Sequence, residues 1–227
     1  MILDVRLRAA ANMVPCGARL ADIGSDHAYL PIALCLENKI KCALASDINE
    51  GPVAAAVSNI KKNCLDDKIK AIRADGLAKA QEFAPDCITV LGMGGELIVR
   101  ILSAAEWIRQ ETITLVLQPM THPEILAKYL ADEGFEVIEE NMVCDNGRDD
   151  RIYRLIKARY NGGRYSLSEF EALVGRKNLD RCDEVTLAYV KRQIRVLEAR
   201  IKGKTSSGQS CESEVALIDQ MKNYLEG

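Results

Sequence analysis

Four short groups of glycine and acidic residues offer the chemistry in this sequence, and each group follows a run of apolar residues. A glycine directly after a strand lets backbone N–H groups approach an anionic part of a ligand. A carboxylate at such a place can accept hydrogen bonds from ribose hydroxyls or from the amino group of a base. The four groups are Gly24-Ser25-Asp26-His27, Asp47-Ile48, Asp75-Gly76-Leu77 and Gly92-Met93-Gly94-Gly95. Their order along the chain favours a nucleotide-like cofactor.

The first group distinguishes between a dinucleotide cofactor and S-adenosylmethionine. A dinucleotide fingerprint requires glycine at its first, third and sixth positions, whereas this chain has Gly24, Asp26 and Tyr29 there. That mismatch argues against NAD. S-adenosylmethionine fits better, because Gly24 would admit its methionine moiety, Asp47 would accept both ribose hydroxyls and Asp75 would accept the adenine amino group. Each acidic residue alone is more often a turn or helix cap, so the prediction depends on all of them together.

The composition is that of a soluble globular protein. The 227 residues are 48% hydrophobic and 28% charged, which suits one α/β domain plus a small appendage. No apolar run reaches the ~18 residues of a membrane span and the N-terminus lacks a signal-peptide pattern, so we expect a cytoplasmic protein. None of the eight cysteines forms a Cys-x-x-Cys pair. We therefore expect buried free thiols, notably Cys35, Cys42, Cys64 and Cys87, and neither disulfides nor a metal site.

Apolar strands alternate with helical segments over the first two thirds of the chain. Strands are expected at 18–23, 42–46, 69–73, 87–91 and 113–118, and helices at 3–14, 32–36, 53–63, around 101–102 and at 125–130. Two further strands, 135–143 and 151–156, are expected to pair antiparallel around a turn at 145–147. This alternation predicts an α/β fold with a doubly wound, mostly parallel sheet. Ligands of such a sheet bind beyond the carboxyl ends of its strands, where the four groups lie.

After Gly163 the composition changes and the strand signals stop. Apolar residues then recur at the spacing of a coiled-coil seam and return as a second helical stripe after a loop at 205–208. The first stripe is Leu187, Val190, Ile194, Leu197 and Ile201, and the second is Val215, Ile218, Met221 and Leu225. We therefore expect two parts, a cofactor-binding domain at 1–160 and a C-terminal α-helical hairpin, or coiled-coil domain, at 161–227.

Charge is unevenly distributed along the chain. Residues 1–147 contain 14 Lys/Arg and 21 Asp/Glu, a net charge of −7, whereas residues 148–204 contain 15 and 8, a net charge of +7. A basic segment on an acidic body suits a polyanionic partner, and a solvated helix face is an equal alternative. If the partner is RNA, the expected phosphate contacts are Lys191, Arg192, Arg195, Arg200, Lys202 and Lys204.

Longer motifs carry a resemblance to one family. They are the run from Asp22 to Pro31, Asp47 with Gly51-Pro52, Asp75-Gly76-Leu77, Gly92 to Gly95, and Leu117-Gln118-Pro119. On these residues the chain resembles the bacterial tRNA (adenine-22-N1)-methyltransferases, the TrmK family, closely over 2–157 and only in character beyond. The resemblance implies a Rossmann-like class I methyltransferase domain, S-adenosyl-L-methionine as the methyl donor, and a C-terminal coiled-coil domain that helps to hold tRNA. It places the cofactor against Gly24, Ser25, Asp26, His27, Asp47, Ile48, Asp75, Gly76, Leu77, Gly92 and Met93.

The fourth group bears on the type of reaction. The chain contains no Pro-Pro dipeptide, so the Asn/Asp-Pro-Pro-Tyr motif of exocyclic-amine methyltransferases is absent. In its place stand glycines, of which Gly94 and Gly95 would let a flat base approach. Adenine N1 already has an in-plane lone pair, so transfer requires alignment more than a strong base. A carboxylate near the base would stabilise its developing positive charge. Asp26 is the candidate, with His27 and Tyr29 as secondary ones.

Other functions use the same residues. One alternative is a methyltransferase for a different RNA position or a small molecule, and another is a non-catalytic protein that binds nucleotide or RNA. The basic segment favours RNA over a small molecule, and the complete set of glycines and acids disfavours a non-catalytic binder. A base that is stacked inside folded tRNA must be extruded to reach such a site. We expect a monomer without a metal or a membrane partner.

Overall fold

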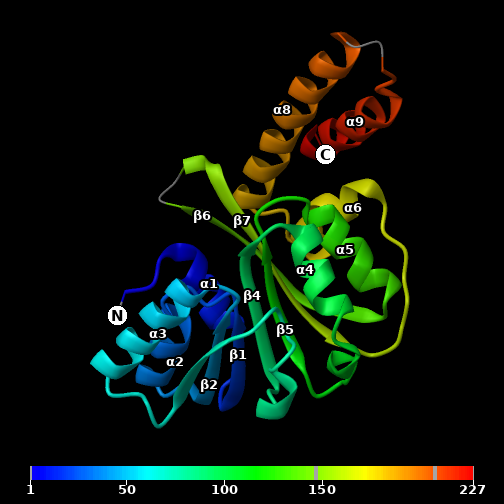
Figure 1. Cartoon of the computed structure of the whole chain (residues 1–227). Helices are drawn as coiled ribbons and strands as arrows, with labels where there is room; N and C mark the ends of the chain where they lie inside the picture. The colour runs from blue at the N-terminus through cyan, green and yellow to red at the C-terminus, as the bar shows by residue number, and fades with distance from the viewer. Residues whose placement is uncertain (1, 146–147, 207–208, 227) are drawn as a thin grey trace.

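A seven-stranded sheet forms the first part of the chain, with strand order β3-β2-β1-β4-β5-β7-β6 (Figure 1). The computed structural model describes residues 2–145, 148–206 and 209–226. The strands are β1 (Ala18–Ile23), β2 (Ile40–Asp47), β3 (Ile69–Arg73), β4 (Cys87–Met93), β5 (Thr114–Pro119), β6 (Phe135–Asp145) and β7 (Arg148–Tyr160). Neighbours among β1 to β5 pair in parallel, and β7 pairs antiparallel with both β5 and β6. The predicted mostly parallel sheet with an antiparallel pair at its end is confirmed.

The β6–β7 hairpin differs from the expectation in length. Both strands are longer than the predicted 135–143 and 151–156. The predicted turn at 145–147 falls largely on residues 146–147, which lie outside the described residues.

Helices cover the sheet on both faces (Figure 1). They are α1 (Val5–Met13), α2 (Tyr29–Leu36) and α3 (Glu50–Lys62) on one face and α4 (Gly95–Ser103) and α5 (Pro123–Asp132) on the other, with short 3-10 turns at Gln81–Phe83 and Glu106–Ile108. Successive strand residues point to opposite faces. Val116 of β5 therefore packs with α1 and α2, whereas Leu115 and Leu117 pack with α4 and α5. Burial on both faces explains why these strands read as continuous apolar runs.

Four helices follow the sheet, namely α6 (Glu169–Val174), α7 (Arg176–Arg181), α8 (Glu184–Ser206) and α9 (Glu212–Glu226). The last two form the expected helical hairpin (Figure 1), and the two short helices were not predicted. The stripe residues Val190, Ile194 and Leu197 are buried, as are Ile218 and Met221.

Two details of the predicted hairpin were wrong. Val215 is 46% exposed and does not belong to the buried stripe. The loop expected at 205–208 begins later, because 205–206 still belong to α8, while 207–208 lie outside the described residues.

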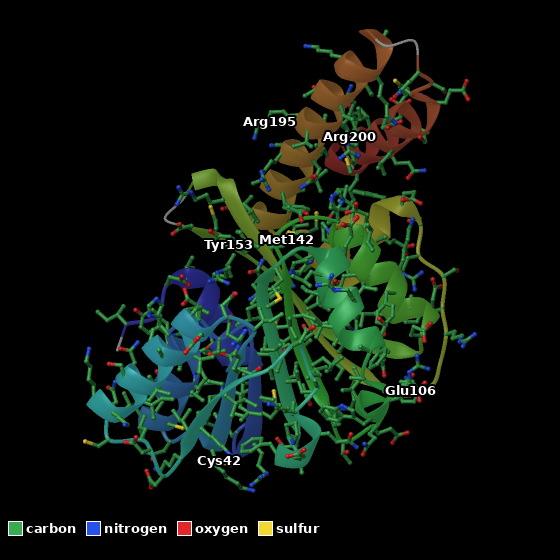
Figure 2. All side chains as sticks on the ribbon, in the orientation of Figure 1. Cys42, Glu106, Met142, Tyr153, Arg195 and Arg200 are labelled. Carbon is green, nitrogen blue, oxygen red and sulfur yellow. The ribbon has the colours of Figure 1, made fainter. Side chains whose placement is uncertain are left out.

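The helical hairpin also packs on the sheet. Met142 of β6 and Ile152 of β7 belong to the same apolar cluster as the buried residues of α8 and α9, and Figure 2 shows Met142 near the base of α8. Because α8 packs against both α9 and the β6–β7 hairpin, coiled-coil character remains a prediction. The same holds for the domain boundary between residues 160 and 161, since the cluster contains residues from both sides.

A buried ion pair connects the hairpin strands to the short helices. Arg154 Nη2 donates to Glu140 Oε1 at 2.5 Å, and their side chains are only 3% and 2% exposed. Arg154 Nη1 also donates to the Ala172 carbonyl in α6 (2.5 Å), and the Lys177 N–H in α7 donates to Glu140 Oε2 (3.1 Å). Gly175 between these helices has φ +96°, and a Cβ there would lie 2.3 Å from the Glu140 carboxylate oxygens. Only glycine fits between the two helices.

The cysteines follow the expectation in part. Cys35 and Cys87 are buried free thiols, and burial raises the pKa of Cys35 to about 11 and that of Cys87 well above its usual range. Cys42 is half-buried, and the prediction of burial was wrong for Cys64, which is exposed just after α3. Within the described ranges, no helix is long and apolar enough to cross a membrane.

Candidate active site

The carboxyl ends of β1 and β4 form the switch point of the sheet, where doubly wound folds have their binding crevice. The chain runs outward from β1 to β2 and β3 and then returns to β4 on the other side of β1. Ligands of open α/β sheets bind at such a point. Gly24 follows β1, Asp47 ends β2, Asp75 lies two residues after β3, and Gly92 and Met93 end β4. The fold therefore brings the four predicted groups to one edge of the sheet.

Two structural features require glycine at position 24, directly after β1. Gly24 adopts φ +71°, and a Cβ on it would lie 2.1 Å from Met93 Cε. The backbone N–H groups of Gly24 and Ser25 donate to the Ser46 carbonyl of β2, at 2.8 and 2.9 Å. The first group is thus tied to β2 and in contact with the fourth group. Any larger residue at Gly24 would displace the Met93 side chain.

The three candidate catalytic residues come together at the start of α2. His27 Nε2 lies 3.3 Å from Asp26 Oδ1, and the His27 ring stacks on Tyr29 with centroids 5.1 Å apart. Asp26 and Tyr29 are exposed. The N-cap of α2 is Ala28, so neither Asp26 nor His27 caps this helix, and Tyr29 is not packed into the core.

The backbone of this turn is strained. His27 and Ala28 both have positive φ, +63° and +56°, which is uncommon for residues other than glycine. Asn59 of α3 donates from Nδ2 to the His27 carbonyl at 3.0 Å and helps to hold the turn. The turn therefore presents Asp26 and His27 from a fixed backbone.

Asp22 is a site residue that the sequence indicates only as part of a motif. It is buried, and its two carboxylate oxygens accept from Ser25 Oγ (2.5 Å) and from Thr89 Oγ1 of β4 (2.6 Å). Burial raises the pKa of Asp22, while the two hydroxyl donors and the charge of Arg6 oppose that shift. Asp22 thus fastens the first turn to β4. Because the Ser25 hydroxyl is turned inward to Asp22, its contact with a cofactor stays a prediction.

The tip of β2 presents a partly satisfied carboxylate. Asp47 is half-buried, and its Oδ1 accepts from the Asn49 N–H at 2.8 Å. The neighbouring Ile48 is 52% exposed, which leaves an apolar surface beside the carboxylate. One residue earlier, the buried Ser46 hydroxyl has no hydrogen-bond partner among the described residues. Unsatisfied buried hydroxyls are rare, and this one is enclosed by protein.

The turn after β3 holds the second carboxylate. Asp75 is exposed, and only its backbone carbonyl is engaged, by the Ala78 N–H at 3.1 Å, among the contacts of the described residues. Gly76 has φ +51° and packs against Ile101 of α4. Leu77 is buried in the core. Of these three predicted contacts, Asp75 alone offers a free side-chain acceptor, and Leu77 contributes packing.

The packing of α4 against the turn between β5 and α5 requires small residues at Gly94 and Gly95. A Cβ on Gly95, the first residue of α4, would lie 2.2 Å from the His122 carbonyl, and a Cβ on Gly94 would lie 3.0 Å from Thr121 Oγ1. The Gly95 N–H donates to the Thr121 carbonyl at 2.7 Å. These glycines therefore let α4 approach the turn between β5 and α5. Their contact with a substrate base stays a prediction.

The basic residues of α8 are divided between its faces. A cleft of about 620 Å³ lies between the turn that precedes α5 and the helices α8 and α9. Arg192 and Arg200 line it, whereas Lys191, Arg195, Lys202 and Lys204 do not. Figure 2 shows Arg195 and Arg200 on opposite sides of α8. The cleft begins at Pro119, at the end of β5, and is therefore adjacent to the switch point.

Comparison with known proteins gives concordant matches. Residues 3–156 match the methyltransferase domain family. A tRNA (adenine(22)-N(1))-methyltransferase of Bacillus subtilis is 37% identical over 146 residues, which cover 64% of this chain and 61% of that protein, less than two thirds of its length.

Solved structures extend the similarity over the whole chain. A Streptococcus pneumoniae protein, assigned as a tRNA (m1A22) methyltransferase and solved with S-adenosyl-L-methionine, is 30% identical with a TM-score of 0.86. That match covers 99% of this chain and 100% of the other. TrmK of M. capricolum in complex with S-adenosyl-homocysteine is 26% identical with a TM-score of 0.84, and covers 100% and 99%.

Proposed function

We propose that this chain, which belongs to the methyltransferase domain family and within it to the TrmK family, methylates tRNA. The proposed reaction transfers the methyl group of S-adenosyl-L-methionine to N1 of adenine 22. The observation that carries the proposal is the arrangement at the switch point. Gly24, Asp47, Asp75 and Gly92 stand at the ends of adjacent strands, in the order that the parts of this cofactor require.

The free acceptors of the crevice fit this cofactor. Asp47 retains an oxygen for the ribose hydroxyls, Asp75 retains its carboxylate for the adenine amino group, and Ile48 offers an apolar surface to the adenine. Gly24 has no side chain, so its backbone can approach the methionine moiety of the cofactor. When bound, S-adenosylmethionine supplies an electrophilic methyl group on a sulfonium.

Asp26 is assigned to the reacting base. Its exposed carboxylate lies in the turn after β1, from which it would accept a hydrogen bond from the adenine amino group and orient N1. The same negative charge stabilises the cationic base that methylation produces. The stacked rings of His27 and Tyr29 offer an aromatic surface to a flat base that has left its stack.

The cleft beside α8 is assigned to tRNA. Its carboxylates are engaged, because Glu124 lies 3.2 Å from His122 Nδ1, Glu169 pairs with Lys128 and Glu214 pairs with Lys204. Arg192 and Arg200, in contrast, form no ion pair with any described carboxylate. Two unneutralised guanidiniums in a cleft next to the switch point suit phosphate groups of a bound RNA. Lys191, Arg195, Lys202 and Lys204 do not line the cleft and remain further candidates, of which Lys204 pairs with Glu214.

Primer extension on tRNA tests the function. An N1 methyl group blocks Watson–Crick pairing, so the protein should create a stop at adenine 22, and a tRNA with guanine at that position should show none. A stop at another nucleotide would assign the methylation to that position. If the protein binds the cofactor and primer extension still shows no stop, the proposal is contradicted.

Paired variants test the RNA cleft. The Arg192→Ala, Arg200→Ala double variant should bind tRNA more weakly, with the slope of log K against log salt reduced by roughly 0.9 for each lost contact. Arg195→Ala removes a charge from the opposite side of α8 and serves as the control. Equal losses in both proteins would contradict a specific role of the cleft. A monomeric state and a cytoplasmic location belong to the same proposal and are tested by sedimentation and by imaging of the tagged protein.

A further inference from the structure

The guanidinium of Arg6 lies at the switch point, although its helix α1 precedes the whole sheet. Arg6 Nη1 donates to Gln118 Oε1 of β5 at 3.2 Å, and the Gly92 N–H of β4 donates to the same oxygen at 3.1 Å. Gly92 has φ +77°, and a Cβ there would lie 3.0 Å from Arg6 Nη1. Arg6 is therefore held directly against the end of β4.

Gln118 is oriented by a second set of contacts. Its side chain is fully buried (0% exposed). Its Nε2 donates to the Pro119 carbonyl at 2.9 Å and lies 3.4 Å from Met120 Sδ. Since an amide has one acceptor oxygen, this arrangement leaves Oε1 for Arg6 and Gly92. A buried polar side chain between two central strands thus serves to position the guanidinium.

The positive charge of Arg6 is not neutralised. Among the described residues no carboxylate forms an ion pair with it, and its described side-chain hydrogen bond goes to a neutral amide. Its charge acts on Asp22, but the oxygens of that carboxylate already accept from Ser25 and Thr89. A guanidinium has five N–H donors, so most of those of Arg6 are available to a ligand.

We propose that Arg6 is the anion-binding residue of the active site and takes an oxyanion that the reactants bring. The reactants of the proposed function, on which this inference rests, contain two such groups: the carboxylate of the cofactor and the phosphate of the target nucleotide. Both match the planar, bidentate donor pattern of arginine. The first helix of the chain therefore contributes a side chain to the site.

Titration of the full chain with two thioethers tests the carboxylate. S-adenosylhomocysteine carries the carboxylate, whereas 5′-methylthioadenosine lacks the amino-acid part. If Arg6 binds the carboxylate, Arg6→Gln should weaken S-adenosylhomocysteine ~10–100-fold in calorimetric titration and leave 5′-methylthioadenosine unchanged. Arg8→Gln is the matched control, since Arg8 lies on the same helix and pairs at the surface with Glu37 at 2.8 Å.

Titration with tRNA tests the phosphate. If Arg6 binds the nucleotide, Arg6→Gln should leave both thioethers unchanged, weaken tRNA binding and reduce its salt slope by roughly 0.9. Arg6→Lys retains the positive charge but not the bidentate donor pattern of the guanidinium, so it should restore part of the lost binding of S-adenosylhomocysteine or tRNA. If the Arg6→Gln protein melts below the Arg8→Gln protein, Arg6→Lys takes its place in both titrations.

Two results would overturn the inference. One is unchanged binding of S-adenosylhomocysteine and tRNA, and the other is an equal loss for both thioethers, which would mean that Arg6 only supports the β4–β5 edge. Measurements on the wild-type chain distinguish a failure of the Arg6 inference from a failure of the proposed function. A wild type that binds S-adenosylhomocysteine and methylates tRNA retains the function whatever the Arg6 variants do.

Discussion

Replacement of Glu140 by glutamine should strongly destabilise this protein, because it removes the counter-charge of a buried arginine. The Glu140 carboxylate accepts from Arg154 Nε and Nη2 with one oxygen and from the Lys177 N–H with the other. Glutamine has a single acceptor oxygen. If that oxygen faces Arg154, the new NH₂ group faces the Lys177 N–H, and if it is turned round, the NH₂ group faces a buried guanidinium.

The size of the effect follows from the burial. Removing one partner of a buried ion pair costs about 3–5 kcal/mol, because the remaining charge is left without compensation. In a protein of 150–250 residues each kcal/mol shifts the melting temperature by roughly 2–4 °C. The variant should therefore melt about 6–20 °C below the wild type. Glu139→Gln is the control, since Glu139 is 50% exposed and lies 3.6 Å from Lys157, a pair for which about 0–1 kcal/mol is expected.

Thermal denaturation followed by circular dichroism measures the melting temperature, and urea denaturation measures the free energy of unfolding. The double variant Glu140→Gln, Arg154→Met also removes the uncompensated charge, so it should recover part of the loss. Recovery is incomplete because the Ala172 carbonyl then loses its donor. Arg154 lines the same cleft as Arg192 and Arg200, so tRNA binding should weaken while S-adenosylhomocysteine binding does not. A destabilisation no larger than that of Glu139→Gln, or strictly additive effects in the double variant, would refute the reasoning.

Three further predictions concern the crevice and the helical part. Asp47→Ala should weaken S-adenosylhomocysteine by ~10–150-fold without lowering the melting temperature, since hydrogen bonds to a charged group contribute roughly 1.5–3 kcal/mol; unchanged affinity in calorimetry would contradict the ribose contact. Asp26→Asn should slow single-turnover methyl transfer by ~10²-fold with little change in cofactor affinity, and a normal saturated rate would remove Asp26 from the mechanism. Hydrogen bonds from Arg176 and from the Ser168 N–H lower the pKa of Glu171 from 4.5 to about 2. Because this pKa is depressed in the folded state, its stabilisation is present above pH 4.5 and is lost as pH falls towards 2. The melting-temperature difference between wild type and Glu171→Gln should shrink over that window, and a difference that persists at pH 2 would contradict this origin.

The strands of the sheet were predictable because two-sided burial leaves a local signal. β1 and β3 have the expected bounds, 18–23 and 69–73. The hairpin strands were underestimated at their ends, where charged residues such as Asp145 and Lys157 interrupt the apolar pattern. Two further charged residues, Glu140 and Arg154, lie within the predicted bounds. Their burial depends on each other and on groups from α6 and α7. No local pattern reports a contact of this kind.

The short helices escaped prediction for a related reason. α6 and α7 have six residues each, too few for a helical period to be recognised. The capping box of Ser168 and Glu171 was present in the sequence as a local signal for α6. The link between α6 and α7 depends on Gly175, whose need for glycine comes from the Glu140 carboxylate on a distant strand.

The candidate site also contains residues that the sequence predicted and contacts that it did not. The glycines and acids at the strand ends were found because their spacing follows the alternation of strands and helices. Gln118 belonged to a recognised motif, but its contact with Arg6 was not found, since the two residues are 112 positions apart and meet only when α1 packs on the sheet. Asp22 belonged to a recognised motif, but its two hydroxyl donors come from different strands or turns. Contacts of this kind require the fold.

Gln118 and Pro119 connect the two places where an anion is expected. Gln118 holds Arg6 at the end of β4, and the next residue, Pro119, begins the cleft that Arg192 and Arg200 line. The switch point and the RNA cleft are therefore joined by one stretch of backbone at the end of β5. If the cleft holds tRNA as proposed, the extruded base would reach the end of β4, where Gly92 lets the Arg6 guanidinium lie close to the backbone. The position of the cleft in turn depends on the Glu140–Arg154 pair, because Arg154 forms part of its wall. Stability of the C-terminal helices and the proposed recognition of tRNA thus involve the same buried ion pair.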